Sequence, residues 1–203
     1  GDTVTIKEPE VLHDVDTVPN TFEYTITNDT NYPNVDTTIG TIQVDKRPIE
    51  ITANSNEWMY DGESHSDSGY IITDGELADG ETIDTVVVTG SITYPGDSAN
   101  VAGGAVITDG SGNNVTDNYD ITYVPGTLTV TKDTTALTIT SGDCATTYDA
   151  QDHTCEEYVV TYGDSTITEC TACAHDTLTH IYVIPTGDTV TIKEPEVLHD
   201  VDT

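Results

Sequence analysis

Four cysteines are the residues of this chain whose type and spacing point most directly to covalent chemistry: Cys144, Cys155, Cys170 and Cys173. An even number of cysteines in a secreted protein is typical of disulfide bonds. Four cysteines allow three pairings. We favour the local one, which joins Cys144 to Cys155 and Cys170 to Cys173. The two rival pairings, which tie the later cysteines back to the earlier ones, stay open.

A zinc site is the alternative use of the same sulfur atoms. Cys170 and Cys173 form a C-x-x-C pair, and His175 with either His153 or Cys155 could complete a tetrahedral set. The sequence contains no second pair with zinc-site spacing. A thioredoxin-like redox role needs a βαβ setting, which is also missing. We therefore expect disulfides and no required metal.

Two acidic loops could bind calcium. Asp109, Ser111 and Asn113 place oxygen atoms at alternate positions, as calcium loops do, although the closing glutamate of an EF-hand is absent. Asp74 and Asp79 lie in a second loop rich in acidic residues. We favour a plain hairpin turn for the first loop, and the second is a weak candidate. Calcium is therefore a cofactor that the chain could bind but does not require.

Glycans could meet this chain in two ways. Asn28 and Asn114 begin Asn-x-Thr triplets and are therefore candidates for N-glycosylation. Trp58 and Tyr60 are close enough in sequence to stack on a sugar, although such aromatic residues more often fill a core or a domain junction.

Composition excludes several classes of function. With 37 acidic and only 5 basic side chains, the net charge is −32, which disfavours nucleic acid and anionic membranes as partners. No apolar run approaches the roughly 18 residues of a membrane span. Acidic residues are so common that no pair stands out as a glycosidase pair, and the histidines form no triad spacing with serine or cysteine. We do not expect an enzyme.

Short runs rich in Thr, Val, Ile and Tyr recur along the chain, separated by Gly, Pro and Asn-Asp turns. No stretch has sustained helical periodicity, so the predicted fold class is all-β. Residues 21–27 alternate as a half-buried strand does, whereas residues 70–73 and 85–88 are apolar enough to be buried on both faces. The predicted strands lie near residues 21–27, 40–44, 49–53, 70–73, 85–88, 105–108, 119–124 and 126–131.

The same 17 residues occur twice. Residues 187–203 repeat residues 1–17 letter for letter, at an offset of 187 − 1 = 186 residues. We interpret this offset as the period of a tandem repeat. On that interpretation, the chain is one full period followed by the start of the next.

A second similarity lies within the period, at an offset of 88 residues. Residues 136–140 parallel 48–52, Tyr148-Asp149 parallels Tyr60-Asp61, and residues 158–161 parallel 70–73. We therefore expect two related β domains in each 186-residue period. One is intact, residues 46–131. The other is split: residues 1–45 are the C-terminal part of one copy, and residues 132–203 are the N-terminal part of the next copy.

The intact domain resembles the MBG-type repeats of bacterial cell-surface adhesins. The resemblance rests on residues 46–53, on Tyr60-Asp61-Gly62, on residues 118–123 and on the closing residues 126–132. It implies small β-rich domains, Ig-like or β-grasp-like, in tandem on secreted surface proteins, without catalytic residues. The split domain departs from this pattern, because Ala150 stands where the intact domain has Gly62.

These observations lead to one functional hypothesis and one alternative. We expect a structural repeat that acts as a spacer in a long extracellular filament or adhesin stalk at the cell surface. Its partners would be neighbouring repeats of the same chain and identical chains. Residues 137–201 would pair with residues 18–44 of the next period, either within one covalent chain or by strand donation between subunits. The alternative is a module that binds glycans or host proteins, in which repeated weak sites act by avidity.

Overall fold

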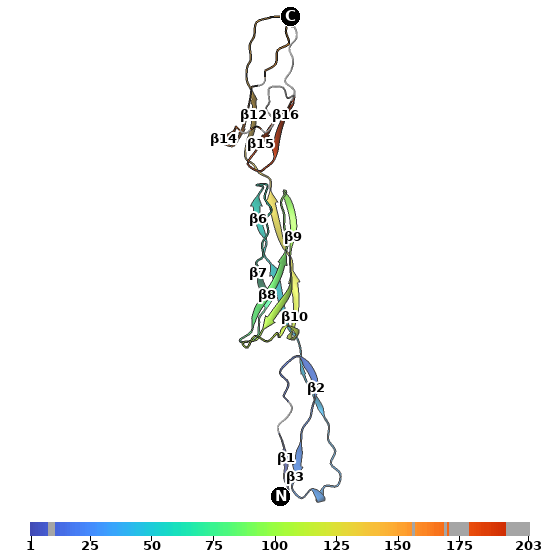
Figure 1. Ribbon diagram of the computed structural model, residues 1–203. Coiled ribbons are helices and arrows are strands. Elements are labelled where there is room, and N and C mark those ends of the chain that lie inside the picture. The colour runs from blue at the N-terminus through green and yellow to red at the C-terminus, as the bar shows by residue number, and fades with distance from the viewer. Residues whose placement is uncertain (8–10, 156, 169, 171–178, 194–203) are drawn as a thin grey trace. The chain divides into compact units, whose positions relative to one another are not determined.

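The computed structural model describes residues 1–7, 11–155, 157–168, 170 and 179–193 (Figure 1). The regular elements of these residues are strands and two three-residue 3-10 helices, η1 (Asp29–Asn31) and η2 (Thr116–Asn118). The predicted all-β class is therefore confirmed. The strands are β1 (Val4–Ile6), β2 (Asp16–Asn20), β3 (Tyr24–Ile26), β4 (Gly40–Val44), β5 (Arg47–Ala53), β6 (Asn56–Met59), β7 (Tyr70–Gly75), β8 (Thr82–Thr89), β9 (Gly96–Thr108), β10 (Tyr119–Val124), β11 (Gly126–Thr131), β12 (Leu137–Ser141), β13 (Tyr158–Tyr162), β14 (Ser165–Ile167), β15 (Thr179–Val183) and β16 (Thr189–Lys193).

The chain divides into two compact units. One comprises Gly1–Asn54, Ser68–Thr89 and Asn100–Gly126; the other comprises Ser55–Asp67, Gly90–Ala99 and Thr127–Thr203.

The core of the first unit forms around β5, which lies between a parallel strand, β10, and an antiparallel strand, β7. Successive side chains of a strand point to opposite faces, so Ile49, Ile51 and Ala53 are buried together while the residues between them are only partly buried. They pack with buried residues of β9 and β10: Ala102, Ala105, Ile107 and Tyr119.

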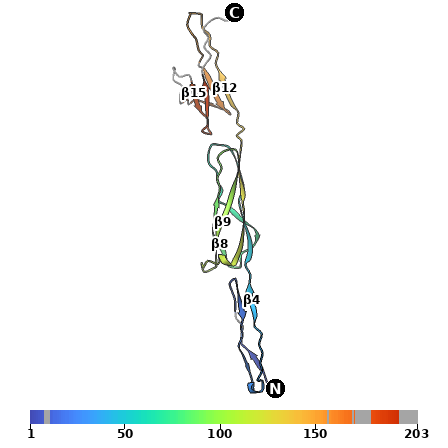
Figure 2. The ribbon, with the colours of Figure 1, turned by 90° about the vertical axis from the view of Figure 1, so that its right-hand side faces the viewer.

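Strand β9 is the longest strand, at 13 residues, and pairs antiparallel with β8 (Figure 2). The strand order of its sheet is β6-β11-β9-β8, and β6 pairs parallel with β11. Gly126 opens β11 beside the turn that follows β5. A Cβ atom on Gly126 would lie 2.2 Å from the carbonyl oxygen of Asn54, so this close backbone approach requires glycine.

The second unit contains the sheet β12-β13-β14 and the antiparallel pair β15–β16. Its buried cluster consists of Val160, Tyr182 and Val190. The turn between β15 and β16 closes where Gly187 donates its N–H to the oxygen of Ile184 at 2.9 Å. Gly187 has a φ of 82°, as the last residue of a three-residue hairpin loop commonly does.

Near the N-terminus the strands form two antiparallel pairs, β1 with β3 and β2 with β4. The predicted strand at residues 21–27 is confirmed only in its centre, Tyr24–Ile26. Thr21 donates its N–H to the oxygen of Pro19 at 2.9 Å, and this tight turn separates β2 from β3.

The remaining strand predictions have mixed outcomes. Strands are confirmed at residues 40–44, 49–53, 70–73, 85–88, 105–108, 119–124 and 126–131. Burial on both faces at 70–73 and 85–88 is wrong, since Ile71 is 56% exposed and Val87 is 59% exposed. Sheets with antiparallel strands can be packed on one face and solvated on the other, and apolar composition alone does not distinguish the two cases.

Candidate functional site

Three of the four cysteines, Cys144, Cys155 and Cys170, are held in disulfides. Cys144 is bonded to Cys155, with 5.6 Å between their Cα atoms, which confirms this part of the favoured local pairing. Cys170 is also disulfide-bonded, and its backbone forms an isolated antiparallel β-bridge with Tyr182 of β15. The other two residues of the zinc alternative, Cys173 and His175, lie outside the described residues. Cys155 and Cys170 could act as zinc ligands only after their S–S bonds were broken.

Two aspartate–histidine turns are the clearest side-chain constellation, and they recur 88 residues apart. In the first, Nε2 of His65 lies 2.9 Å from Oδ1 of Asp61, which also accepts the N–H of Glu63 at 2.9 Å. The hydrogen bond from Glu63 and that from His65 hold the pKa of Asp61 below its ordinary value. Trp58 stacks on His65, with 4.8 Å between ring centroids, so this ring covers one face of the tryptophan.

The second turn repeats the first. Nε2 of His153 lies 2.8 Å from Oδ1 of Asp149, which accepts the N–H of Gln151 at 3.0 Å. The hydrogen bond from Gln151 and then that from His153 lower the pKa of Asp149. In each turn the carboxylate caps the backbone two residues later, which is the geometry of an Asx turn. These pairs therefore hold a loop closed, and that role accounts for their geometry without catalysis.

The loop of the first turn packs on the β15–β16 hairpin. A Cβ atom on Gly62 would lie 1.8 Å from the carbonyl oxygen of Thr186, so only glycine allows this approach. Nearby, a hydrogen bond to Asp188 raises the pKa of Tyr60. Ala150, the counterpart of Gly62, also has a positive φ, 62°, which is uncommon for alanine. The Tyr-Asp-Gly signature is therefore explained by packing.

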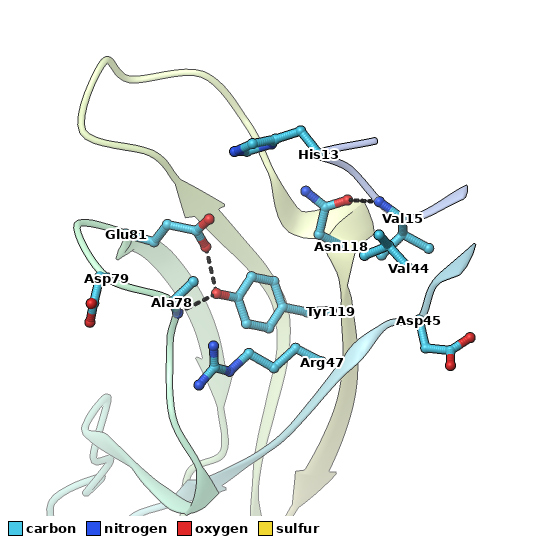
Figure 3. Close-up of a pocket in the computed structure, with 10 residues that line it drawn as sticks. All are labelled: His13, Val15, Val44, Asp45, Arg47, Ala78, Asp79, Glu81, Asn118 and Tyr119. Atoms are coloured by element: carbon cyan, nitrogen blue, oxygen red, sulfur yellow. Dashed lines mark hydrogen bonds between the residues drawn. The ribbon is translucent and has the colours of Figure 1, made fainter. Parts of the chain in front are cut away.

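A cavity of about 500 Å³ lies beside the start of β10 (Figure 3). Tyr119 donates its hydroxyl hydrogen to Oε2 of Glu81 at 2.5 Å and accepts the N–H of Ala78 at 2.8 Å. Burial, followed by the hydrogen bond to Glu81, raises the pKa of this tyrosine. The lining residues are His13, Val15, Val44, Asp45, Arg47, Ala78, Asp79, Glu81, Asn118 and Tyr119.

On the other side of this cavity, Asn118 holds the loop before β2. Its Oδ1 accepts the N–H of Val15 and its Nδ2 donates to Oδ1 of Asp14, both at 3.0 Å. Tyr119 and Asn118, two of the polar residues around the cavity, are thus each engaged as donor and acceptor. Small-molecule pockets are lined mainly by apolar and aromatic groups. Here seven of the ten lining residues have a polar or charged side chain. The arrangement acts as a structural tie.

The candidate calcium residues lie in two places. Asp109 accepts N–H groups from Ser111 and Asn113 through Oδ1 and from the side chain of Asn113 through Oδ2, at 2.8–2.9 Å. Its carboxylate therefore closes the turn after β9, and these bonds hold its pKa low. Asp74 lies in β7 opposite Glu50, whereas Asp79 lines the cavity. Over the described ranges, no group of three or more His, Cys, Asp or Glu side chains could hold a metal ion.

Both glycosylation candidates are exposed. Asn28 has a left-handed backbone, with a φ of 58°, and its Nδ2 donates to Asp2 at 2.7 Å. Asn114 accepts the N–H of Thr116 through its side-chain oxygen at 2.9 Å. The side chain of each asparagine is thus engaged in a local turn.

Sequence reasoning missed the aspartate–histidine turns, the Tyr119–Glu81 bond and the double contact of Asn118. A signal for the turns was present, since His65 and His153 are separated by the same 88 residues as the aspartates. The bonds of Tyr119 and Asn118 join residues distant in sequence and had no local signal.

Comparisons with protein-family models, with curated proteins and with solved structures found no match to this chain. In the part of the chain that the structure describes, no helix has the length and apolar character needed to cross a membrane.

Proposed function

We propose that this chain is a structural repeat of a long extracellular fibre or adhesin stalk at the cell surface, where it acts as a spacer. The observation that carries the proposal is the identity of residues 1–17 and 187–203. The described parts of both copies contain a strand, β1 in one and β16 in the other. A sequence that recurs unchanged suits a repeat in which every unit has the same mechanical task.

The duplicated geometry supports a tandem arrangement of two related domains per 186-residue period. In the intact domain, residues 46–131, Ile51 of β5 pairs with Ile72 of β7. Ile139 of β12 pairs with Val160 of β13 in the same register, and both partners are shifted by 88 residues. The two aspartate–histidine turns follow the same offset. We assign residues 132–203 to the first part of a second domain, and residues 1–45 to the last part of its preceding copy.

The domain type that we propose is the MBG-type repeat of bacterial adhesins, Ig-like or β-grasp-like in architecture. The support comes from positions where its signature residues have structural tasks. Gly62 is the only residue that fits against Thr186, Tyr119 bonds to Glu81 and Ala78, and Gly126 lies against the backbone of Asn54. Each task is structural, which fits a role without catalysis.

An extracellular location is supported by the Cys144–Cys155 disulfide, because such bonds persist in oxidising compartments and are rare in the cytosol. The net charge of −32 also fits a chain that must not adhere to nucleic acid or to anionic lipid. The partners that we propose are the adjoining repeats of the same chain and identical chains packed beside it.

The size of the native assembly tests this proposal. We expect assemblies boiled in denaturant and reductant to migrate as a very large species, since the repeats are joined by peptide bonds. A polymer of separate subunits linked by donated strands would dissociate to units near 21.7 kDa. That outcome would contradict the covalent array.

A binding module is the alternative function. Tyr94 is 72% exposed and stacks on Tyr60 at 6.3 Å, so an aromatic surface is available to a sugar or peptide. A glycan array probed with the recombinant chain distinguishes the two functions. A spacer gives no selective signal, whereas a binding module gives a signal that Tyr94→Ala removes.

A further inference from the structure

The two copies of the repeated strand pair through opposite edges. In the first copy, Lys7 donates its N–H to Glu23 at 2.9 Å, and Thr27 donates its N–H to the oxygen of Thr3 at 3.0 Å. Hydrogen-bonded pairs alternate along an antiparallel ladder. Residues 3, 5 and 7 therefore direct their backbone groups toward β3, whereas Val4 and Ile6 direct theirs away from it.

The second copy uses the other edge. Ile184 donates its N–H to the oxygen of Asp188 at 2.9 Å, and the register places Tyr182 opposite Val190. Residues 188, 190 and 192 therefore direct their backbone groups toward β15. These residues correspond to 2, 4 and 6 of the first copy, which are the positions that do not bond to β3. Within the described residues, β1 pairs only with β3 and β16 only with β15.

We propose that a single strand uses both edges at once, and that it thereby joins each period to the next. This inference rests on the tandem array proposed above, in which residues 187–193 of one period are residues 1–7 of the following one. The shared strand would bond to β15 through residues 188, 190 and 192. It would bond to β3 of the following period through residues 189, 191 and 193. The result is a three-stranded sheet in the order β15, shared strand, β3.

The side chains of the shared strand fit this sheet. In β16, Val190 is 9% exposed and packs with Val160 and Tyr182. Its copy in β1, Val4, is 63% exposed, and the pairing of β1 with β3 places Ile26 opposite Val4. When β1 and β16 are one strand, β3 is carried to the edge of this apolar cluster. Tyr24 and Ile26 then extend the cluster on the same face.

A second strand has an unpaired edge in the same region. Leu137 and Ile139 of β12 are 45% and 51% exposed, whereas Ile49 and Ile51, their counterparts in β5, are 3% and 0% exposed. Two kinds of neighbour make the difference. Strand β5 is flanked by β7 and β10 and also packs on Ala102, Ala105 and Ile107 of β9, whereas β12 pairs only with β13 among the described residues.

The sequence that matches β10 lies in the N-terminal part of the chain. Asn31-Tyr32 and Gly40 correspond to Asn118-Tyr119 and Gly126, with one more residue between them in the N-terminal copy. Three apolar side chains of this segment are 44–46% exposed: Tyr32, Val35 and Ile39. The structure assigns no strand to residues 32–39. In the array, this segment of the following period takes the place of β10 beside β12, so that it covers Leu137 and Ile139.

Cysteine labelling in a chain of two tandem periods tests the inference. Ile139→Cys and Val159→Cys form a matched pair, since the side chains that they replace are 51% and 50% exposed. Native cysteines that are held in disulfide bonds do not react with a maleimide, so only the introduced thiol is labelled. We expect both variants of the 203-residue chain to react with the maleimide at similar rates. In the first of two periods, Ile139→Cys should react with the maleimide at least about tenfold more slowly than in the single-period chain. The rate of Val159→Cys should be unchanged.

The same two-period chain carries its own controls. Ile139→Cys in the second period should react at the rate of the single-period chain, because no period follows it. Tyr24→Cys should show the opposite order, protected in the second period and reactive in the first. Equal rates in the two periods for Tyr24→Cys would overturn the shared strand, and equal rates for Ile139→Cys would overturn the placement of residues 32–39 beside β12. The labelling rates are measured independently of the size of the native assembly in denaturant and reductant. A failure of the shared strand can therefore be distinguished from a failure of the covalent array.

Discussion

Val4 and Val190 occupy the same position in two identical segments, yet Val4 is 63% exposed and Val190 is 9% exposed. Val190 is buried because β15 brings Tyr182 opposite it and β13 supplies Val160. Val4 has only β3 as its paired neighbour among the described strands. The same residue therefore contributes differently to the free energy of unfolding in the two copies.

The first prediction follows from this difference. Val190→Ala should lower the free energy of unfolding by about 2 kcal/mol, since it removes buried methyl groups and leaves a cavity. Val4→Ala should change it by less than about 0.5 kcal/mol, as exposed substitutions usually do. Urea denaturation of the 203-residue chain measures both. Equal effects would contradict the assigned burial.

The second prediction concerns the cysteines. The unreduced protein should have a mass lower by four hydrogens than the sequence mass, and it should contain no zinc. The Cys144–Cys155 bond closes a loop with a sequence separation of 11, worth about 3 kcal/mol in the chain-entropy model. Replacing both residues by alanine should lower the melting temperature. Four reactive thiols in native protein would refute the prediction.

The third prediction concerns acid. The pKa values of Asp61 and Asp149 are lowered in the folded state, chiefly by the N–H groups of Glu63 and Gln151. Their stabilising contribution is therefore present above the ordinary aspartate pKa of about 4 and is lost as the pH falls through the lower folded values. NMR titration of the carboxyl carbons measures these values directly. Asp61→Asn with Asp149→Asn should weaken the loss of stability below about pH 4.

The fourth prediction concerns the hydroxyl of Tyr119. Tyr119→Phe should cost about 1–2 kcal/mol, because Glu81 and the N–H of Ala78 lose their partner. Since folding raises the pKa of Tyr119, stability should also decline as the pH rises above about 10, and less so in the variant. Tyr148→Phe, at a position that is 66% exposed, is the control and should be neutral. Equal losses in the two variants would contradict a role for the hydroxyl.

The fifth prediction concerns charge. With a net charge of −32, the chain should melt at a higher temperature as salt screens its carboxylates. Calcium should raise the melting temperature further than sodium at matched ionic strength if it bridges carboxylates such as Asp74 and Asp79. A melting temperature that responds to neither salt would contradict this prediction.

The local pattern of the sequence was sufficient to identify most strands. Ile49, Ile51 and Ala53 alternate with polar residues, and this pattern predicts one buried face wherever the strand is placed. The 88-residue offset likewise predicted that β12 and β13 would resemble β5 and β7, and the two pairs share their register. Such features depend on neighbours within a few residues, or on comparison of the chain with itself.

The partners of each strand were decided by the tertiary structure. The parallel pairing of β10 with β5 joins residues about 70 positions apart, and nothing local to Tyr119 or Arg47 specifies it. The tertiary structure also decided among the three cysteine pairings. It brings the Cα atoms of Cys144 and Cys155 to 5.6 Å from each other, within the range that a disulfide bond allows. Residues 4–6 and 190–192 show why sequence alone does not specify the partner, since segments of identical sequence pair through opposite edges. The backbone N–H and C=O groups of a strand are alike on both edges, so the segments that come within reach determine which edge is used.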